Sequence, residues 1–371
     1  MDERTGQHRG ADGVAGSGRS AGGLAVRRFS SGCAGALLYC AAGCAAVGAV
    51  PKNPGPAYEW HLPPGFPPPA VPADNPMSDA KVALGRRLFN DPQFSLTGTY
   101  SCASCHQRDK AYTDGRAQAI GATGNAVRRS AMSLANVAYN IAFTWGDSRV
   151  RSLEAQMRTP LFSTHPVEMG EAQSGGAVLA AINDDSQYRR QFSEAFGRSR
   201  PVSMQHMIQA IAAYERTLIS GRAAFDRYLF DDDAGAMSEE AKRGMALFYS
   251  HRVGCARCHF GLNFSGPIRY RDHEPRRALF ANNGLQRGPD RGLMEVTARP
   301  ADRGKFKVPT LRNIALTAPY MHDGSLPTLR AVLAHYMRGG PQLPPFSLSE
   351  TEQTDLLAFL GSLTDRTFVS D

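Results

Sequence analysis

The stretch Cys102-Ala103-Ser104-Cys105-His106 decides the fold of this 371-residue chain. Its spacing, Cys-x-x-Cys-His, is the attachment signature of a c-type haem. Two thiols about one turn apart can each form a thioether with a vinyl group of the same porphyrin, and the adjacent His can ligate its iron. The pattern recurs at Cys255-Ala256-Arg257-Cys258-His259. The sequence therefore predicts two covalently bound haem c groups, with His106 and His259 as iron ligands.

Two alternative interpretations of these motifs are a redox-active Cys pair and half of a zinc site. A redox pair needs no following His, and a zinc site would have to explain two copies that each carry one. Of the seven Cys, four lie in the motifs, and Cys33, Cys40 and Cys44 lie in a short apolar stretch near the N-terminus. No Cys is therefore left for a structural disulfide in the body of the chain.

The composition indicates a globular protein rather than a disordered one. Hydrophobic residues make up 42% of the chain, and its length suits two domains of ordinary size. The net charge of +8 is compatible with nucleic-acid binding, but no basic run or binding motif accompanies it. We therefore predict no nucleic-acid partner.

Residues 1–50 resemble a secretory signal. Arg27-Arg28 precede an apolar run from about Cys33 to Val50, which is too short and too rich in Gly for a membrane span. Ala41-Ala42-Gly43-Cys44 is similar to a lipobox, so signal cleavage and lipidation at Cys44 both stay open. Because covalent haem attachment is expected outside the cytoplasm, we predict a periplasmic or otherwise exported protein that touches the membrane only through a lipid anchor.

The rest of the chain divides into a Pro-rich lead-in at 51–77 and two similar units at 78–230 and 231–371. Each unit opens with a capped helix, carrying Gly85-x-x-Leu88-Phe89 in the first and Gly244-x-x-Leu247-Phe248 in the second, and then runs through a loop to its haem motif. Strand signals are nearly absent. Helices are expected at about 78–90, 147–158, 176–196, 203–219, 238–248, 326–338 and 349–363. The predicted class is all-α with long loops, built from two cytochrome c-like haem domains related by internal duplication.

From about residue 76 to its end the chain resembles the bacterial di-haem cytochrome c peroxidase and MauG superfamily. The resemblance rests on both haem motifs and on the segments 143–145, 153–156, 165–170, 307–313 and 316–324. Residues 62–66 and 76–78 are most similar to the MbnH branch. The resemblance implies an oxidoreductase that uses H2O2 to form a high-valent haem pair. That pair would oxidise a Trp or Tyr of a secreted partner at long range, the partner being an MbnP-like copper-associated protein.

The resemblance also assigns roles to single residues. The haem on His106 would meet peroxide, and the haem on His259 would store and pass electrons. Trp145 aligns with a relay tryptophan between the haems, the alternative being a buried core aromatic. Glu168 aligns with a distal acid that moves a proton of bound H2O2. Gln156 aligns with a second distal polar residue, the alternative being an ordinary helix-surface side chain.

Two departures from ordinary di-haem peroxidases matter. No His lies between His106 and His165, so we expect a five-coordinate iron at His106 without prior reduction. Where those peroxidases use Met as the second ligand of the other haem, the matching residue is Tyr336, with Met337 as the neighbouring alternative. A phenolate from Tyr336 would lower the potential of that haem. Ligation by Met337 would instead indicate a cytochrome c peroxidase that takes electrons from a small cytochrome or cupredoxin.

The family also holds a calcium ion between its haems. Backbone oxygens of Thr317 and Pro319 would bind it here, as a hard cation requires. Ser130 replaces the usual Asn ligand, which weakens this expectation. A plain di-haem electron carrier is a third class, and Glu168 together with the missing blocking His argues against it.

Overall fold

The structure is a computed structural model that describes residues 58–197, 202–285 and 288–370. These residues belong to one compact unit. The segment at 1–50 that is predicted to be a signal or lipobox, Cys44 included, lies outside the described residues.

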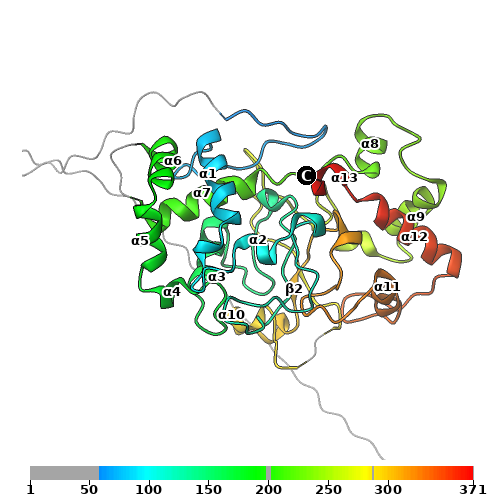
Figure 1. The fold of residues 1–371 in the computed structure, drawn as a ribbon. Helices are drawn as coiled ribbons and strands as arrows, with labels where there is room; N and C mark the ends of the chain where they lie inside the picture. Colours follow the sequence, from blue (N-terminus) through cyan, green and yellow to red (C-terminus); the bar gives the residue numbers. More distant parts are fainter. Residues whose placement is uncertain (1–57, 198–201, 286–287, 371) are drawn as a thin grey trace, which may run out of the picture. The chain divides into compact units, whose positions relative to one another are not determined.

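Helices and long loops make up this unit (Figure 1). The α-helices are α1 (Asp79–Asn90), α2 (Cys102–Cys105), α3 (Leu153–Phe162), α4 (Glu171–Ser174), α5 (Ala177–Asp184), α6 (Ser186–Phe196), α7 (Met204–Arg216), α8 (Ala224–Phe230), α9 (Glu239–Tyr249), α10 (Met294–Thr297), α11 (Leu329–Met337), α12 (Glu350–Ser362) and α13 (Arg366–Val369). Short 3-10 helices are η1 (Pro92–Phe94), η2 (Arg108–Lys110), η3 (Val137–Tyr139), η4 (Cys255–Arg257), η5 (Pro300–Asp302) and η6 (Ile314–Leu316). In the described part of the chain, β1 (Phe280–Ala281) and β2 (Phe306–Lys307) form the one sheet, an antiparallel pair. The predicted all-α class with long loops is confirmed.

The two haem motifs follow helices that are crossed in the same way. α1 packs across α7, and α9 packs across α12. A Cβ atom added at Gly85 would lie 1.9 Å from the carbonyl oxygen of Ala210, and one added at Gly244 would lie 1.9 Å from that of Asp355. Both glycines are therefore needed because two helix backbones touch there. The repeated Gly-x-x-Leu-Phe pattern thus marks a repeated helix crossing.

Each helix crossing has its own hydrophobic core. The first core contains buried side chains from Leu84 to Leu218, and the second contains buried side chains from Phe225 to Leu363. The cores divide the chain between Leu218 and Phe225, so α8 packs with the second core. The domain boundary expected between residues 230 and 231 stays a proposal.

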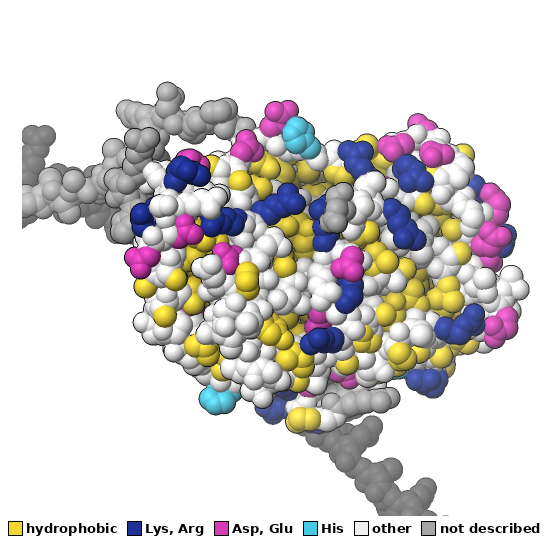
Figure 2. Space-filling model, in the orientation of Figure 1, with side chains coloured by type: hydrophobic (Ala, Val, Ile, Leu, Met, Phe, Trp, Pro, Cys, Tyr) yellow, Lys and Arg dark blue, Asp and Glu magenta, His cyan; other side chains and the backbone are white. Residues whose placement is uncertain are grey.

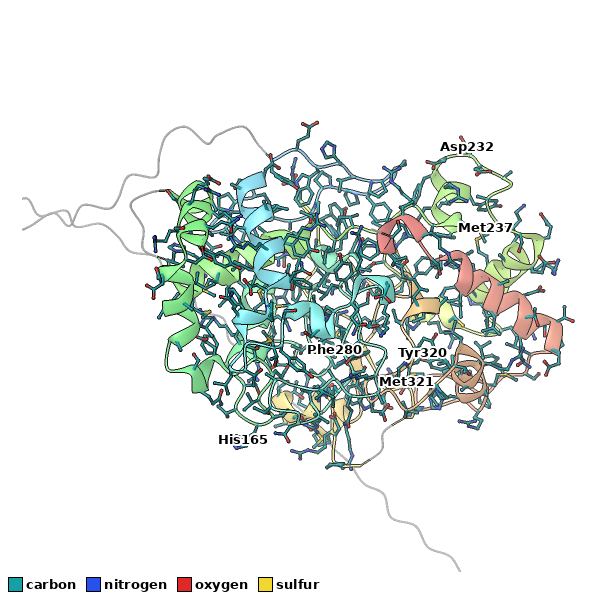
Figure 3. The ribbon with its side chains drawn as sticks, viewed as in Figure 1. His165, Asp232, Met237, Phe280, Tyr320 and Met321 are labelled. Carbon is teal, nitrogen blue, oxygen red and sulfur yellow. The ribbon has the colours of Figure 1, made fainter. Side chains whose placement is uncertain are left out.

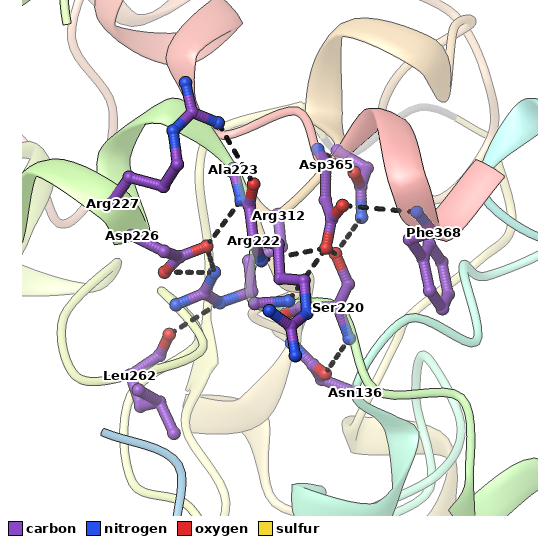
Figure 4. Close-up of polar contacts among 12 residues, drawn as sticks. Asn136, Ser220, Arg222, Ala223, Asp226, Arg227, Leu262, Arg312, Asp365 and Phe368 are labelled. Carbon is purple, nitrogen blue, oxygen red and sulfur yellow. Dashed lines mark hydrogen bonds and ion pairs between the residues drawn. The ribbon is translucent and has the colours of Figure 1, made fainter. Parts of the chain in front are cut away.

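A buried polar network ties the two halves together (Figure 4). Arg312 is 1% exposed, and one of its guanidinium nitrogens lies 2.9 Å from each carboxylate oxygen of Asp226. Asp365 accepts backbone hydrogen bonds from Gly221 and Arg222. Removing one partner of the Arg312–Asp226 pair would strand a buried charge at a cost of about 3–5 kcal/mol.

The described part of the Pro-rich lead-in has no helix or strand, yet it is packed against the body. Phe66 is buried, and the hydroxyl of Tyr139 donates to the carbonyl oxygen of Pro67 at 2.8 Å. The backbone N–H of Arg271 donates to Pro68 at 2.9 Å. The lead-in therefore contacts both halves of the molecule.

On the face shown in Figure 2, Lys and Arg side chains are dispersed among acidic and apolar ones. Within the described residues, every helix is too short or too polar to cross a membrane.

Candidate di-haem site

His106 follows α2, which carries Cys102 and Cys105 on one short turn. Its ring Nδ1 lies 2.8 Å from the carbonyl oxygen of Tyr112. A carbonyl only accepts, so Nδ1 carries the proton and Nε2 keeps a lone pair. Burial lowers the pKa of His106, which keeps the ring neutral. This is the tautomer that binds a metal through Nε2, fixed by a backbone hydrogen bond.

His259 is held in the same way in the second half. Its Nδ1 lies 2.8 Å from the carbonyl oxygen of Phe264, and burial lowers its pKa to about 4. With Nδ1 held by this carbonyl, Nε2 is the nitrogen of the neutral ring that could bind a metal. Both motifs therefore present an imidazole suited to iron.

The four motif thiols are free and at least half-buried. Burial raises the pKa of Cys102 and Cys255 to about 12 and that of Cys105 to about 11. A redox-active Cys pair needs the opposite shift, because its thiolate is the nucleophile. Among the described residues no group of three His, Cys, Asp or Glu side chains could hold a metal ion, so a zinc site is also not assembled there.

A cavity opens beside His106, and Glu168 lies in its wall with Cys102 and Cys105. Burial raises the pKa of the Glu168 carboxyl. The backbone of Glu168 is fixed, because its carbonyl oxygen accepts from the N–H of Ala122 at 2.7 Å. A partly buried, positioned carboxyl whose pKa is raised can both accept and donate a proton.

Gln156 and His165 line the same cavity from different elements. Gln156 lies on α3 and is half-buried, so its amide belongs to the cavity wall rather than to an open surface. His165 is exposed at the cavity mouth, with Nδ1 3.1 Å from the hydroxyl of Thr164 (Figure 3).

A second cavity opens beside His259, and Tyr336 of α11 lines it. Burial raises the pKa of the Tyr336 phenol to about 12. Met337 packs instead against the core of the second half. Met321 supplies a thioether to this cavity wall, and its sulfur accepts from the side-chain amide of Asn283 at 3.3 Å. Met321 stands in the segment 316–324, and no pattern in the chain marks it as a candidate ligand.

Trp145 lines both cavities and a smaller one beside them. Its indole N–H donates to the carbonyl oxygen of Ser130 at 3.0 Å, and its own carbonyl oxygen accepts from the N–H of Lys307 at 2.8 Å. Thr317 and Pro319, the proposed calcium ligands, line the smaller cavity together with Ser130. The indole is thus held where the walls of the two haem cavities meet.

Sequence reasoning missed two buried charged residues in these walls. Lys307 is 5% exposed, and its ammonium group lies 3.4 Å from the carbonyl oxygen of Val308. Burial lowers its pKa to about 8. A buried cation without a counter-charge is costly, and a haem brings two carboxylates that would supply one. The other residue is Glu215, on α7. The sequence does not mark Lys307 or Glu215 as a site residue, because both lie within ordinary helical or strand-like patterns.

The donor set of each cavity fits a c-type haem: two thiols, one imidazole Nε2 and an apolar wall. The buried ammonium of Lys307, which lines the cavity of His259, fits an anionic cofactor as well. Fold and site together define a di-haem c-type cytochrome with an acid in one of its two pockets.

Comparison with known proteins agrees with this class. The family model described as di-haem cytochrome c peroxidase matches residues 79–234. The methylamine utilization protein MauG of Methylorubrum extorquens is 39% identical over 301 residues, which are 79% of this chain and 80% of that protein. The cytochrome c551 peroxidase of Nitrosomonas europaea is 33% identical over 295 residues, 79% of this chain and 83% of that one. The crystal structure of a MauG-like protein associated with microbial copper homeostasis superposes with a TM-score of 0.79 at 38% identity, covering 85% of this chain and 98% of the other.

The chain therefore belongs to the di-haem cytochrome c peroxidase and MauG family. It is an enzyme, a di-haem c-type peroxidase, and its cofactors are haem c groups.

Proposed function

We propose that this enzyme uses H2O2 in the His106 cavity to oxidise a Trp or Tyr of a secreted partner protein. The observation that carries the proposal is that Tyr336 lines the cavity of His259 whereas Met337 packs into the core. A phenolate ligand lowers the potential of a haem, which suits a site that holds oxidising equivalents rather than one that accepts electrons readily. The structure with 38% identity, a MauG-like protein associated with copper homeostasis, favours an MbnP-like copper-associated partner.

Bound haem supplies the redox chemistry, and the chain supplies proton transfer and positioning. Glu168 takes a proton from one oxygen of H2O2 and returns it to the departing oxygen, as a partly buried carboxyl of raised pKa can do. Gln156 donates a hydrogen bond to the bound peroxide from the same wall. The segment between His106 and His165 contains no His, so it would offer no imidazole to compete with peroxide for a bound haem iron.

Trp145 serves as the electron relay between the two sites, because its ring lines both cavities. Backbone oxygens of Thr317 and Pro319, with Ser130 beside them, would hold a calcium ion in the smaller cavity. The enzyme works outside the cytoplasmic membrane, where covalent haem attachment is expected, and lipidation at Cys44 would tether it there.

The second candidate is a cytochrome c peroxidase that draws electrons from a small cytochrome or cupredoxin. Its support is the likeness to the peroxidase of Nitrosomonas europaea and the presence of Met321 in the second cavity. Thioether ligation from Met321 or Met337 would raise the potential of that haem and favour electron uptake.

The two candidates are separated by substitution of the proposed ligand. In the oxidised holoenzyme, electron paramagnetic resonance should show one high-spin and one low-spin ferric signal, and H2O2 should remove both. Tyr336→Met should keep both haems and the peroxide reaction of the high-spin site, but the low-spin signal should then survive peroxide and oxidation of the partner should stop. If Tyr336→Met leaves both responses intact while Met337→Leu or Met321→Leu removes the low-spin signal, the peroxidase assignment is the correct one.

A further inference from the structure

Glu215 is a buried acid in the wall of the His106 cavity that the proposed reaction does not use. It is 5% exposed and lies on α7, the helix that crosses α1. Its Oε2 atom is fully buried and has no hydrogen-bond partner in the described residues. An ionised carboxylate in this state would cost several kcal/mol, so the side chain should be a neutral acid when the pocket carries no extra positive charge.

The second half of the molecule provides an internal comparison. Gly85 touches the carbonyl oxygen of Ala210, and Gly244 touches that of Asp355, so these two positions correspond. Glu215 lies five residues after Ala210, and Leu360 lies five residues after Asp355. Both are buried and both line the cavity of their own half. The fold therefore accepts Leu at this place, and an acid is present only in the half whose cavity also holds Glu168.

The cation beside Glu215 does not offset the negative charge that an ionised Glu215 would carry. Arg216 favours its ionised form, but the guanidinium of Arg216 is already paired with Glu154 at 2.7 Å, and Glu154 opposes ionisation. Burial raises the pKa of Glu215 to about 8. The other ionisable groups that line the cavity or act on this pair are Tyr100, Cys102, Cys105, His106, Arg128, Arg129, His165, Glu168 and Lys81.

An acid placed in this way responds to the charge of a nearby iron. When the iron loses an electron, the cavity gains one positive charge, and an ionised carboxylate becomes more favourable. When the iron gains an electron, that stabilisation is lost and the acid takes up a proton. The size of this response is large because a buried cavity screens charge poorly.

We propose that Glu215 couples proton uptake to electron arrival at the haem held by His106. One electron from a small redox protein reduces the iron, and one proton from solvent binds the Glu215 carboxylate, so the net charge of the pocket is unchanged. Oxidation reverses both steps. The inference rests on the proposed peroxide site at His106 but not on the identity of the oxidised partner.

The test is a spectroelectrochemical titration of the holoenzyme with chemical mediators between about pH 6 and 9, followed at the high-spin absorption band. In the wild type the midpoint potential should fall with pH by up to about 59 mV per unit, the one-electron equivalent of a tenfold change in proton concentration. Glu215→Gln and Glu215→Leu, the latter copying Leu360, should flatten this dependence. Glu171→Gln is the matched control, because Glu171 is buried in the same half with a raised pKa but does not line the cavity.

Infrared difference spectra of the reduced minus the oxidised wild type should show a protonated carboxyl band that Glu215→Gln lacks. A pH dependence that persists in both Glu215 variants overturns the proposal, and so does its loss in Glu168→Gln alone, which would make Glu168 the coupled acid. If the variants fail to hold haem, the wild-type spectrum still decides, because absence of the carboxyl band contradicts the proposal. The titration contains neither peroxide nor partner, so its outcome is independent of whether partner oxidation is observed.

Discussion

At the scale of single residues, the first cavity is set apart by its carboxyl groups. Glu168 and Glu215 both line it, and burial raises the pKa of each. The cavity of His259 is lined instead by Tyr336, Leu356 and Leu360. The carboxyl groups that could move a proton therefore lie in the wall of the first cavity, whereas the wall of the second contains the phenol of Tyr336 and the buried ammonium of Lys307.

Glu168→Gln should keep both haems but slow the reaction with H2O2 by about a hundredfold or more, the contribution of a positioned acid–base group. Gln has the shape of Glu but cannot take and return a proton. Stopped-flow absorbance after mixing with H2O2 measures this rate, and Glu171→Gln should react like the wild type. An unchanged rate in Glu168→Gln would assign the proton transfer to another group of the cavity, with Glu215 the next to test.

At the scale of elements, the two helix crossings set the position of each haem motif. α1 and α9 each precede a motif along the chain, and each is held against a partner helix by a glycine contact. A side chain at either glycine would force the helix away from its partner and move the loop that carries the thiols. Helix packing and haem placement are therefore coupled through Gly85 and Gly244.

Gly85→Ala should destabilise the holoenzyme by about 1–3 kcal/mol, the usual cost of overpacking, because the added methyl meets a backbone carbonyl that cannot rotate away. Gly361→Ala is the control: it lies exposed on α12 with nothing within 4 Å of the added atom, and it should gain up to about 1 kcal/mol in helix propensity. Denaturant titrations of both variants against the wild type measure the difference. Equal stability of Gly85→Ala and Gly361→Ala would mean that α1 can shift without cost.

The sequence predicted elements well wherever a local signal fixed them. Ser78, Ser238 and Ser349 begin α1, α9 and α12 as expected, because each hydroxyl accepts from a backbone N–H three residues on. The expected helix at 147–158 begins only at Leu153, where Ser152 caps α3, and the one at 176–196 is split because the Asp185 carboxylate caps α6.

The residues of the candidate site also differ in whether a local pattern in the sequence marks them. Motif spacing located His106, His259 and the four thiols, since it is a local property of the chain. Glu215 and Lys307 carry no local signature, because their significance is burial beside a cavity formed by residues far apart in sequence. The resemblance to a family placed Trp145, Glu168 and Tyr336 in cavity walls, which spacing alone would not have done.

At the scale of the whole molecule, the function depends on the two cavities keeping a fixed relation. The buried Arg312–Asp226 pair and the Asp365 network join the halves, and the packed lead-in contacts both. Trp145 is held from both sides, by Ser130 of the first half and Lys307 of the second. A rigid junction is what a relay residue requires, because transfer between two sites depends on their separation staying constant.

Trp145→Phe should leave both haems, both ferric signals and the first reaction with peroxide in place, but it should slow the sharing of oxidising equivalents between the two sites. Phe keeps an apolar ring in the wall but is much harder to oxidise than Trp, and it lacks the N–H that donates to Ser130. Rapid-freeze paramagnetic resonance measures this as a delay between loss of the high-spin signal and loss of the low-spin signal.

Trp60→Phe is the matched control, because Trp60 is the only other tryptophan in the chain and packs edge-on against Tyr58 away from both cavities. If the two signals disappear together in Trp145→Phe as they do in Trp60→Phe, electrons pass between the halves by another route, and the smaller cavity with Tyr320 and Met321 in its wall is where that route would lie.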